Sequence, residues 1–410
     1  MAASFVSLQL NDSYKPVTDG VAVCVENYAR HLARRGTSTA VATPWVPGFT
    51  DSDEFPVFRY ASVPIPGWKP YRAGLPDVDP GFRRHLRSWM DTDAATPVVL
   101  HAHSPFSSAA LARRIRRRLR GQGRSVVLVA TLHSKYHSDF ARVLPEPIVE
   151  QILRVIRRSF EAADLVWVPN RGTERTLRWY GYEGPVTIVP NGADLEPPED
   201  GRYAELRGRG ATLLNLDDSD RILLFVGQHR WEKNIELILR GFDRYRRSRA
   251  AEDFRGWSRL VLVGDGPDRR AIAALADDLG LLDADGRSAP LTLYGHVSDR
   301  REMEALYARA DLFVFPSIYD NAPLVVREAA AFRTPSILAA GSDAAGDTAD
   351  RRNAFHVDPE VPALAALLED LGRSPRLLTA VAQAARREVF RSWDDIVVDV
   401  RRRYAQATAY

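Results

Sequence analysis

The chain has 410 residues, of which 45% are hydrophobic and 27% are charged, and its formal net charge is +3. This length is too great for one ordinary hydrophobic core and fits two domains of about 200 residues each, while the composition is that of an ordinary globular protein. The single cysteine, Cys24, excludes an internal disulfide framework and is typical of a reducing compartment, so we expect a cytoplasmic protein.

The N-terminal stretch predicts a strand rather than a targeting segment. MAASFVSLQL lacks the basic region and long apolar core of a signal peptide, and no apolar run in the chain approaches the ~18 residues that span a bilayer. After a strand over 5–10 and a polar loop, a helix is expected over 21–35 with Gly36 as its stop. Gly20 at the helix entrance would let a ligand approach the backbone, although a turn glycine explains it equally well in isolation.

The next segments continue the alternation of strands and helices. A second strand is expected over 39–43, a mostly looped stretch over 44–80, and a third strand over 98–100 that leads into His101 and His103. Two histidines at i and i+2 with no third ligand at a useful spacing make a poor metal site, so no metal is predicted there.

An arginine-rich helix is expected over 107–120, with an apolar stripe at Leu111, Ile115 and Leu119. Three interpretations compete for its Arg113–Arg120 face: a solvated outer helix, a peripheral contact with an anionic membrane, and a nucleic-acid patch. The solvated face is favoured and the membrane contact is kept open. Nucleic acid is excluded as a partner because the interleaved aromatics of a single-strand binder are missing.

A buried strand over 125–130 ends close to His133, which places a histidine just past the carboxyl end of a strand. Strands over 163–168 and 186–194 follow. The proline- and glycine-containing stretch 196–218 has weak periodicity and is predicted to be an interdomain linker.

The second half restarts the pattern with strands over 222–226, 260–263 and 291–294. A helix is expected from about Asn234 to Arg246, so Lys233 stands at a helix start, where the dipole disfavours a cation. That disfavoured position slightly favours a functional lysine over an incidental one.

The stretch DLFVFPSIYDNAPLVVRE predicts a strand over 312–315, a polar loop, and a helix over 324–331. Asp320 and Glu328 are eight positions apart, so at ~100° per residue they could flank one cleft at the start of this helix. The free amides and dipole of a helix start favour an anion. A strand over 336–339 and a helical C-terminal tail complete the chain.

Several of these stretches, in this order, resemble the retaining glycosyltransferases of family four, which have the GT-B fold. The resemblance is carried by NDSYKPVTDGVAVCVENYARHLARRG, HAHSPF, TLHSKY, TIVPNGAD, VGQHRWEKN, DLFVFPSIYDNAPLVVRE and NAFHVDP. It implies an α/β protein with two Rossmann-like domains facing across a cleft: 1–195 on the acceptor side, 196–218 as linker, 219–390 on the donor side, and 391–410 as a helix returning to the first domain.

The resemblance also implies roles for individual residues. His133, Lys233, Asp320 and Glu328 would be catalytic, and His103, Lys135 and Tyr136 would lie on the acceptor side. The donor would be bound by Gly20, Gln228, Arg230, Lys233, Val297, Asp320, Asn321, Ala322, Pro323, Leu324 and Glu328. Three family positions differ, with Gln228 in place of arginine and with Pro323 and Ala354 in place of glycine.

The implied activity is transfer of a hexose or N-acetylhexosamine, with retention, from a nucleotide sugar to an acceptor hydroxyl of a glycan, lipid or small natural product. By family, a UDP-sugar is the expected donor, and no further cofactor or metal is required. Two alternatives stay open: a catalytically impaired nucleotide-sugar-binding protein, and an epimerase or phosphorylase relative. No lysine at a strand end presents itself to anchor pyridoxal phosphate, which a phosphorylase of the best-known type would need.

Overall fold

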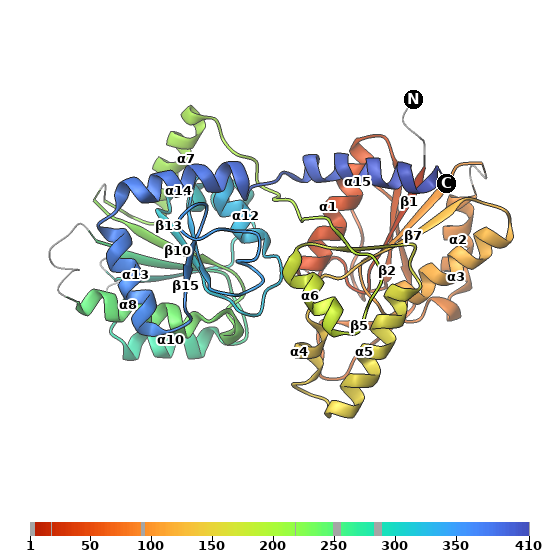
Figure 1. Ribbon diagram of the computed structural model, residues 1–410, viewed down its shortest axis with the longest axis horizontal. Coiled ribbons are helices and arrows are strands. Elements are labelled where there is room, and N and C mark those ends of the chain that lie inside the picture. The colour runs from red at the N-terminus through yellow and green to blue at the C-terminus, as the bar shows by residue number, and fades with distance from the viewer. Residues whose placement is uncertain are drawn as a thin grey trace. The chain divides into compact units, whose positions relative to one another are not determined.

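The chain forms two compact units, Met1–Asn191 with Trp393–Tyr410, and Gly192–Ser392. This computed structural model describes residues 5–17, 19–91, 95–217, 219–248, 256–282 and 289–409. A parallel β-sheet forms the centre of each unit (Figure 1).

The first unit alternates strands and helices for most of its length. Its elements are β1 (Val6–Leu10), α1 (Gly20–Arg34), β2 (Ser38–Pro44), β3 (Val57–Tyr60), β4 (Ser62–Pro64), β5 (Arg72–Gly74), the 3₁₀ turn η1 (Pro76–Val78), α2 (Pro80–Met90), β6 (Val98–Ala102), α3 (Ser107–Gly121), β7 (Val126–Thr131), α4 (Tyr136–Phe140), α5 (Glu146–Glu161), β8 (Leu165–Val168), α6 (Arg171–Trp179), β9 (Thr187–Ile188) and the C-terminal α15 (Trp393–Thr408).

The second unit repeats the alternation. Its elements are α7 (Asp200–Leu213), β10 (Ile222–Val226), the 3₁₀ turn η2 (Trp231–Lys233), α8 (Ile235–Arg247), β11 (Arg259–Val263), α10 (Arg269–Asp278), β12 (Leu291–Gly295), α11 (Arg300–Arg309), β13 (Leu312–Phe315), α12 (Leu324–Ala331), β14 (Ser336–Ala339), β15 (Phe355–Val357), α13 (Val361–Gly372) and α14 (Pro375–Glu388).

Both sheets reverse their strand order once. The first has the order β3-β2-β1-β6-β7-β8-β9 and the second the order β12-β11-β10-β13-β14-β15, and the strand pairs within each are parallel. The chain moves to one side of β1 and then returns to add β6 on the other side, and it does the same around β10 and β13. Each unit therefore has a topological switch point, where open α/β sheets place ligand sites beyond the carboxyl ends of the strands.

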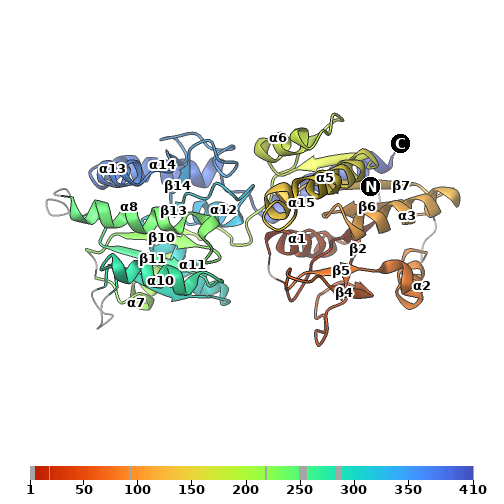
Figure 2. The same ribbon diagram turned by 90° about the horizontal axis from the view of Figure 1, so that it is seen from below.

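Apolar runs that are buried on both faces explain the parallel sheets. The residues of β1, β6 and β13 are all buried, and helices lie on both sides of each sheet (Figure 2). Helix α8 packs against α13, and α7 packs against α11. Together with the sheets, these contacts confirm the expected fold class of two Rossmann-like domains.

The C-terminal helix returns to the first unit, as expected, and lies along α1 (Figure 1). Its Asp394 forms an ion pair with Arg35, the C-cap residue of α1, and lies 3.4 Å from Nδ1 of His31. Its Tyr404 is fully buried, stacks on Trp167 with 5.4 Å between ring centres, and hydrogen-bonds His101. The last helix is therefore part of the core of the first unit.

Three stretches differ from the sequence expectation. Residues 57–60 form the edge strand β3 inside the stretch expected to be loop, and β4 and β5 form an antiparallel hairpin after it. The strand expected over 186–194 is limited to Thr187–Ile188. Residues 200–213, within the expected linker, form α7, whose Leu206 lies in the core of the second unit.

Candidate active site

The loops that carry most of the expected donor-binding residues lie at the β10/β13 switch point. Gln228, Arg230 and Lys233 follow β10, and Asp320 follows β13. Because β10 and β13 are neighbouring parallel strands, both loops leave the sheet at the same edge. The topology thus gives these residues the position where open α/β sheets bind ligands.

Lys233 and Asp320 meet at this edge. Their ammonium and carboxylate groups form an ion pair in which the side chains are only 15% and 19% exposed. The hydroxyl of Ser317 donates a hydrogen bond to the second carboxylate oxygen of Asp320 at 2.6 Å. The ammonium nitrogen also lies 5.8 Å from the ring centre of Phe315 and 5.9 Å from that of Tyr319, within the range of cation–π attraction. A cation is therefore held in place at the edge of the sheet.

Close backbone packing fixes the loop that leads to Lys233. Gly227 and His229 donate their backbone N–H groups to the carbonyl oxygens of Val263 and Asp265, each at 3.0 Å. Gly264 has φ 133°, and a Cβ atom added there would lie 2.0 Å from the carbonyl oxygen of Gly227. Glycine is thus required where the two loops touch.

Other residues of this region have different surroundings. Gln228 and Arg230 are exposed, and neither side chain has a hydrogen-bond or ion-pair partner within the part of the chain that the structure describes. Val297 follows β12, and its side chain packs against the hydrophobic core. His229 was not singled out from the sequence. It is fully buried, neither ring nitrogen has a hydrogen-bond partner among the described residues, and burial lowers its pKa.

Helix α12 begins beside Asp320 without a side-chain cap. Pro323 is its N-cap residue, and over the described ranges no side chain hydrogen-bonds its first-turn amides as a cap. Asn321 is buried, whereas Ala322 and Leu324 are partly exposed. An uncapped helix start presents N–H groups and the positive end of the helix dipole, so this end of α12 suits an anion.

Glu328, one turn further along α12, has a different partner from Asp320. The hydroxyl of Tyr307 in α11 donates a hydrogen bond to its carboxylate at 2.9 Å. Burial raises the pKa of Glu328 to about 7, and nearby Asp194 adds to the rise, whereas the Tyr307 bond and Arg300 oppose it. Tyr307 was not found from the sequence, because nothing in the local spacing links it to a residue 21 positions later.

Replacing Glu328 with glutamine is expected to raise the free energy of unfolding at pH 8 by about 1–3 kcal/mol. The folded-state pKa of about 7 lies above the ordinary value of ~4.3, so ionising the carboxyl costs stability as the pH rises through 7. At pH 5 the folded carboxyl is protonated, so the gain should nearly vanish. Urea unfolding at the two pH values measures the difference.

The matched control is Glu302→Gln, because Glu302 also accepts a tyrosine hydroxyl, that of Tyr294 at 2.6 Å. Glu302 lies in the first turn of α11, where an acidic side chain is favourable, so its replacement should give no gain. Equal effects of Glu328→Gln at pH 5 and pH 8 would contradict the burial argument.

Gly20 is the first residue of α1, at the β1/β6 switch point of the first unit. It is exposed, and a Cβ atom added there would meet nothing within 4 Å. The carboxylate of Asp19 accepts the N–H of Ala22 at 2.7 Å, so one first-turn amide of α1 is already capped. This helix start therefore offers less to an anion than that of α12.

His133 lies past the end of β7 and is the outermost member of a hydrogen-bonded chain. Its Nε2 lies 3.0 Å from Nδ1 of His103, whose Nε2 lies 2.8 Å from Oε1 of Gln9. Gln9 in turn donates to the hydroxyl of Ser7 at 2.7 Å. Burial lowers the pKa of His133 to about 4 and that of His103 well below its usual value, so both rings are neutral near pH 7.

The hydrogen-bonded chain determines which ring nitrogen of each histidine carries the hydrogen atom. The amide oxygen of Gln9 accepts, so His103 carries its proton on Nε2 and its Nδ1 accepts from His133 Nε2–H. Nδ1 of His133 then carries no hydrogen and can act only as an acceptor. The structure thus brings His103, expected on the acceptor side, together with His133. Gln9 was missed because a buried strand glutamine carries no sequence signal of its partner 94 positions away.

The remaining acceptor-side candidates follow His133 directly. Lys135 is partly exposed and is the N-cap residue of α4, and Tyr136 begins that helix. The Tyr136 ring contacts Phe106 edge-on at 5.2 Å and stacks near Phe140, and burial raises the pKa of its phenol. Tyr136 is therefore part of an aromatic cluster.

The arginine-rich helix is α3, and its apolar stripe of Leu111, Ile115 and Leu119 lies in the hydrophobic core. The stripe is therefore not available to lipid. Most of its arginines pair with aspartates: Arg114 with Asp77, Arg116 and Arg120 with Asp164, and Arg118 with Asp91. A peripheral membrane contact through this helix stays a prediction.

The described ranges contain neither a cluster of metal ligands nor a membrane-spanning helix. No set of three or more histidine, cysteine, aspartate and glutamate side chains there is arranged to hold a metal ion. Likewise, none of the helices described combines the length and apolarity needed to cross a bilayer.

Each half of the chain matches the model of a known protein family. Residues 18–197 match the model described as Glycosyltransferase Family 4, and residues 213–388 match that described as Glycosyl transferases group 1. A curated relative, the alpha-monoglucosyldiacylglycerol synthase of Acholeplasma laidlawii, is 23% identical over 342 residues, covering 80% of this chain and 78% of its own.

Solved structures show the same fold over nearly the whole chain. Sucrose-phosphate synthase from Thermosynechococcus elongatus has a TM-score of 0.73 at 21% identity, with 98% of this chain and 99% of that chain covered. Anabaena Alr3699/HepE, solved in complex with UDP, has a TM-score of 0.71 at 16% identity, with 99% and 100% covered. The architecture is therefore GT-B, as the resemblance implied.

Proposed function

Because the chain belongs to glycosyltransferase family 4, whose members transfer a sugar from a nucleotide sugar, we propose that this enzyme uses a UDP-sugar. It transfers a hexose or N-acetylhexosamine with retention to a hydroxyl of a glycan, lipid or small natural product. The UDP complex of the Anabaena protein supports uridine, and the name of the Acholeplasma relative supports glucose and a lipid acceptor within these classes.

The ion pair of Lys233 and Asp320 at the β10/β13 switch point is the observation that carries this proposal. It places a mostly buried cation next to the uncapped start of α12. A nucleoside diphosphate gathers negative charge as it leaves the sugar, and a fixed cation with helix amides stabilises that charge most in the transition state. Arg230, exposed and without a partner among the described residues, adds a second cation in place of the family arginine at Gln228.

The other candidates divide the donor between them. Asp320, with the backbone of residues 321–324, holds the transferred sugar, and Glu328 accepts the two ribose hydroxyls as a carboxylate. The acceptor atom Nδ1 of His133 takes a hydrogen bond from a hydroxyl of the transferred sugar. No side chain needs to act as a strong nucleophile, because leaving-group stabilisation and substrate positioning lower the activation free energy.

A thermal-shift comparison tests the donor class. UDP is expected to raise the melting temperature more than GDP or ADP at equal concentration, since ligand at 100 times its Kd adds about 2.7 kcal/mol of stability. Uridine should stabilise far less than UDP, because the diphosphate supplies the contacts to Lys233. The Lys233→Ala variant should therefore respond weakly to both ligands.

The reaction itself is tested by incubating the enzyme with a UDP-sugar and no acceptor. The release of UDP and the anomeric configuration of the released sugar are measured. Slow UDP release with an α-configured sugar from an α-donor supports the proposal. A preference for GDP or ADP would overturn the uridine assignment, and tight UDP binding with no release or transfer would overturn retaining transfer in favour of a binding role.

A further inference from the structure

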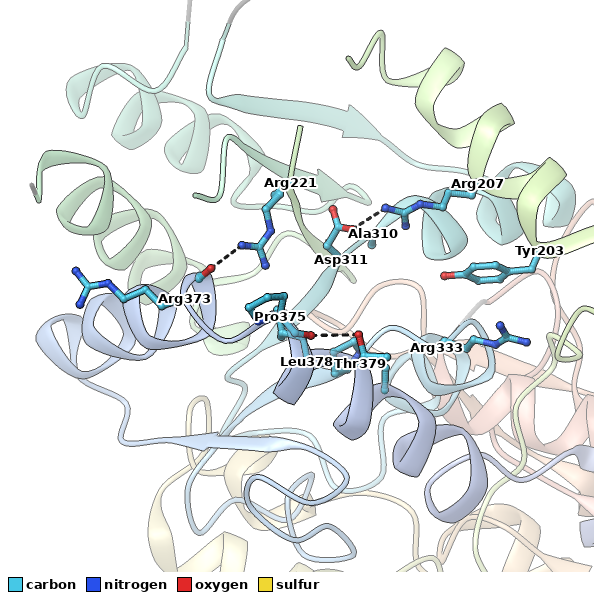
Figure 3. A pocket seen from close by; sticks show the side chains of 13 residues that line it. Tyr203, Arg207, Arg221, Ala310, Asp311, Arg333, Arg373, Pro375, Leu378 and Thr379 are labelled. Carbon is cyan, nitrogen blue, oxygen red and sulfur yellow. Dashed lines mark hydrogen bonds and ion pairs between the residues drawn. The ribbon is translucent and has the colours of Figure 1, made fainter. Parts of the chain in front are cut away.

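A cavity lies in the second unit, at the amino ends of the strands, whereas the donor candidates lie at their carboxyl ends. Its lining includes Arg221, Asp311 and Pro335, which immediately precede β10, β13 and β14. Lys233 and Asp320 follow the carboxyl ends of β10 and β13. The cavity has a volume of about 610 Å³, within the range of small-molecule sites, and Figure 3 shows its side chains.

Positive charge dominates this lining. Arg207, Arg221, Arg333 and Arg373 line the cavity, and Asp311 is the acidic residue among them. Within the lining, four guanidinium groups stand against one carboxylate, and the acidic partners of Arg333 and Arg373 lie outside it. Arginine is also the side chain best suited to bind phosphate through two parallel hydrogen bonds.

Two of these arginines are fixed in place (Figure 3). Arg207 donates to the carboxylate of Asp311 at 2.7 Å and to the carbonyl oxygens of Ala308 and Arg309 at 3.2 and 3.3 Å. Arg221 donates to the carbonyl oxygen of Gly372 at 2.9 Å and lies over the ring of Trp257 at 4.1 Å. Burial lowers the pKa of Arg221, because removing the charged guanidinium from water costs free energy. A bound anion would reduce that desolvation cost.

The other two arginines have exposed carboxylate partners. Arg333 pairs with Asp200, whose side chain is 86% exposed, and also lies over the ring of Tyr203 at 4.9 Å. Arg373 pairs with Glu369 at 2.8 Å, with both side chains more than a third exposed. Exposed pairs of this kind are worth little, so a phosphate could take over either arginine at a small cost.

Helix α14 contributes the remaining polar and apolar features. Its start, at Pro375, lines the cavity and has neither a side-chain cap nor an acidic residue in its first turn. The dipole of this helix therefore adds to the positive potential. Tyr203, Pro335 and Leu378 give the cavity an apolar wall as well.

We propose that this cavity, lined by Arg207, Arg221, Arg333, Arg373 and the start of α14, binds a small phosphate ester with an apolar or aromatic body. The phosphate takes hydrogen bonds from the arginines, and the organic part lies against Tyr203 and Leu378. The site is separate from the donor site, and the proposal does not rest on the function proposed above.

Calorimetric titration of the Lys233→Ala protein tests this site, because that background weakens phosphate binding at the β10/β13 edge. Phenyl phosphate is expected to bind saturably and about tenfold tighter than inorganic phosphate, while phenol should not bind. Replacing both Arg333 and Arg373 with glutamine should weaken phenyl phosphate binding at least about tenfold, because two charged hydrogen-bond donors are lost.

The matched control replaces Arg240 and Arg352 with glutamine. Both belong to exposed ion pairs of the same unit, with Glu236 and Glu388, so the net charge changes equally. Binding by this control should equal that of its Lys233→Ala parent. Absence of saturable binding, or equal loss in both double variants, would overturn the site. Equal affinity for inorganic phosphate and phenyl phosphate would overturn the ester and leave free phosphate as the ligand.

Discussion

Replacing Lys233 with alanine is expected to lower kcat/KM for the nucleotide sugar by roughly 10³-fold, close to the loss seen when one preorganised transition-state contact is removed. The ammonium group is held by Asp320 and by two aromatic faces, so it is in place before the donor arrives. Because charge on the diphosphate grows as the sugar departs, most of the loss should appear in kcat. Steady-state release of UDP with and without acceptor measures both constants.

Three variants separate this role from a structural one. Lys233→Arg keeps the charge and should recover much of the activity. If Lys233 served only to neutralise Asp320, the double variant Lys233→Ala with Asp320→Asn would be as active as the parent. Lys69→Ala removes an exposed lysine of the first unit and should leave kcat/KM within about twofold. Nucleotide release that is unchanged in folded Lys233→Ala would show that the leaving group is stabilised elsewhere.

The elements around this lysine were predicted closely because their signals are local. The apolar run Leu312–Phe315 is buried throughout, and prolines mark both the end of that strand and the start of α12. Such features can be inferred because strand ends and helix starts are determined within a few residues.

Features that depend on distant contacts could not be predicted in this way. Helix α7 contains Gly208 and Gly210, and its weak periodicity suggested a linker. The structure gives the reason for Gly210: a Cβ atom there would lie 2.3 Å from the carbonyl oxygen of Ala305, so glycine allows α7 to pack closely on α11. The edge strand β3 was also missed, because three partly buried residues and the buried Tyr60 after a proline give too short a pattern.

The site shows the same division. The candidates Lys233, Asp320, His133 and Glu328 could be named from their motifs, but the hydrogen-bond partners of His133 and Glu328 could not. Tyr307 reaches Glu328 from another helix, and Gln9 reaches His133 only through His103. These partners are defined by sheet register and helix packing, which a single sequence does not display.

Replacing His133 with alanine is expected to lower kcat by roughly 10²-fold, the effect of losing about 2–3 kcal/mol of hydrogen bonding in a desolvated site. His133 is neutral, because burial lowers its pKa to about 4, and its Nε2–H is held by His103. Its Nδ1 can therefore accept a sugar hydroxyl at any pH above about 5. The pH profile of kcat should show no loss attributable to His133 between pH 5 and 8.

Gln9→Leu tests whether the buried chain orients this ring. It removes the acceptor of His103 Nε2–H, so the tautomer of His133 is no longer fixed, and kcat should fall by about tenfold with little change in KM. Nitrogen-15 NMR of the histidine rings reports the tautomer directly, a readout that a loss of stability alone would not move. The control is His137→Gln, since His137 is a partly exposed histidine of the same unit that pairs with Glu146. Activity of His133→Ala within threefold of the parent, or a titration near pH 6.5 that disappears in this variant, would exclude a neutral His133 as the hydroxyl acceptor.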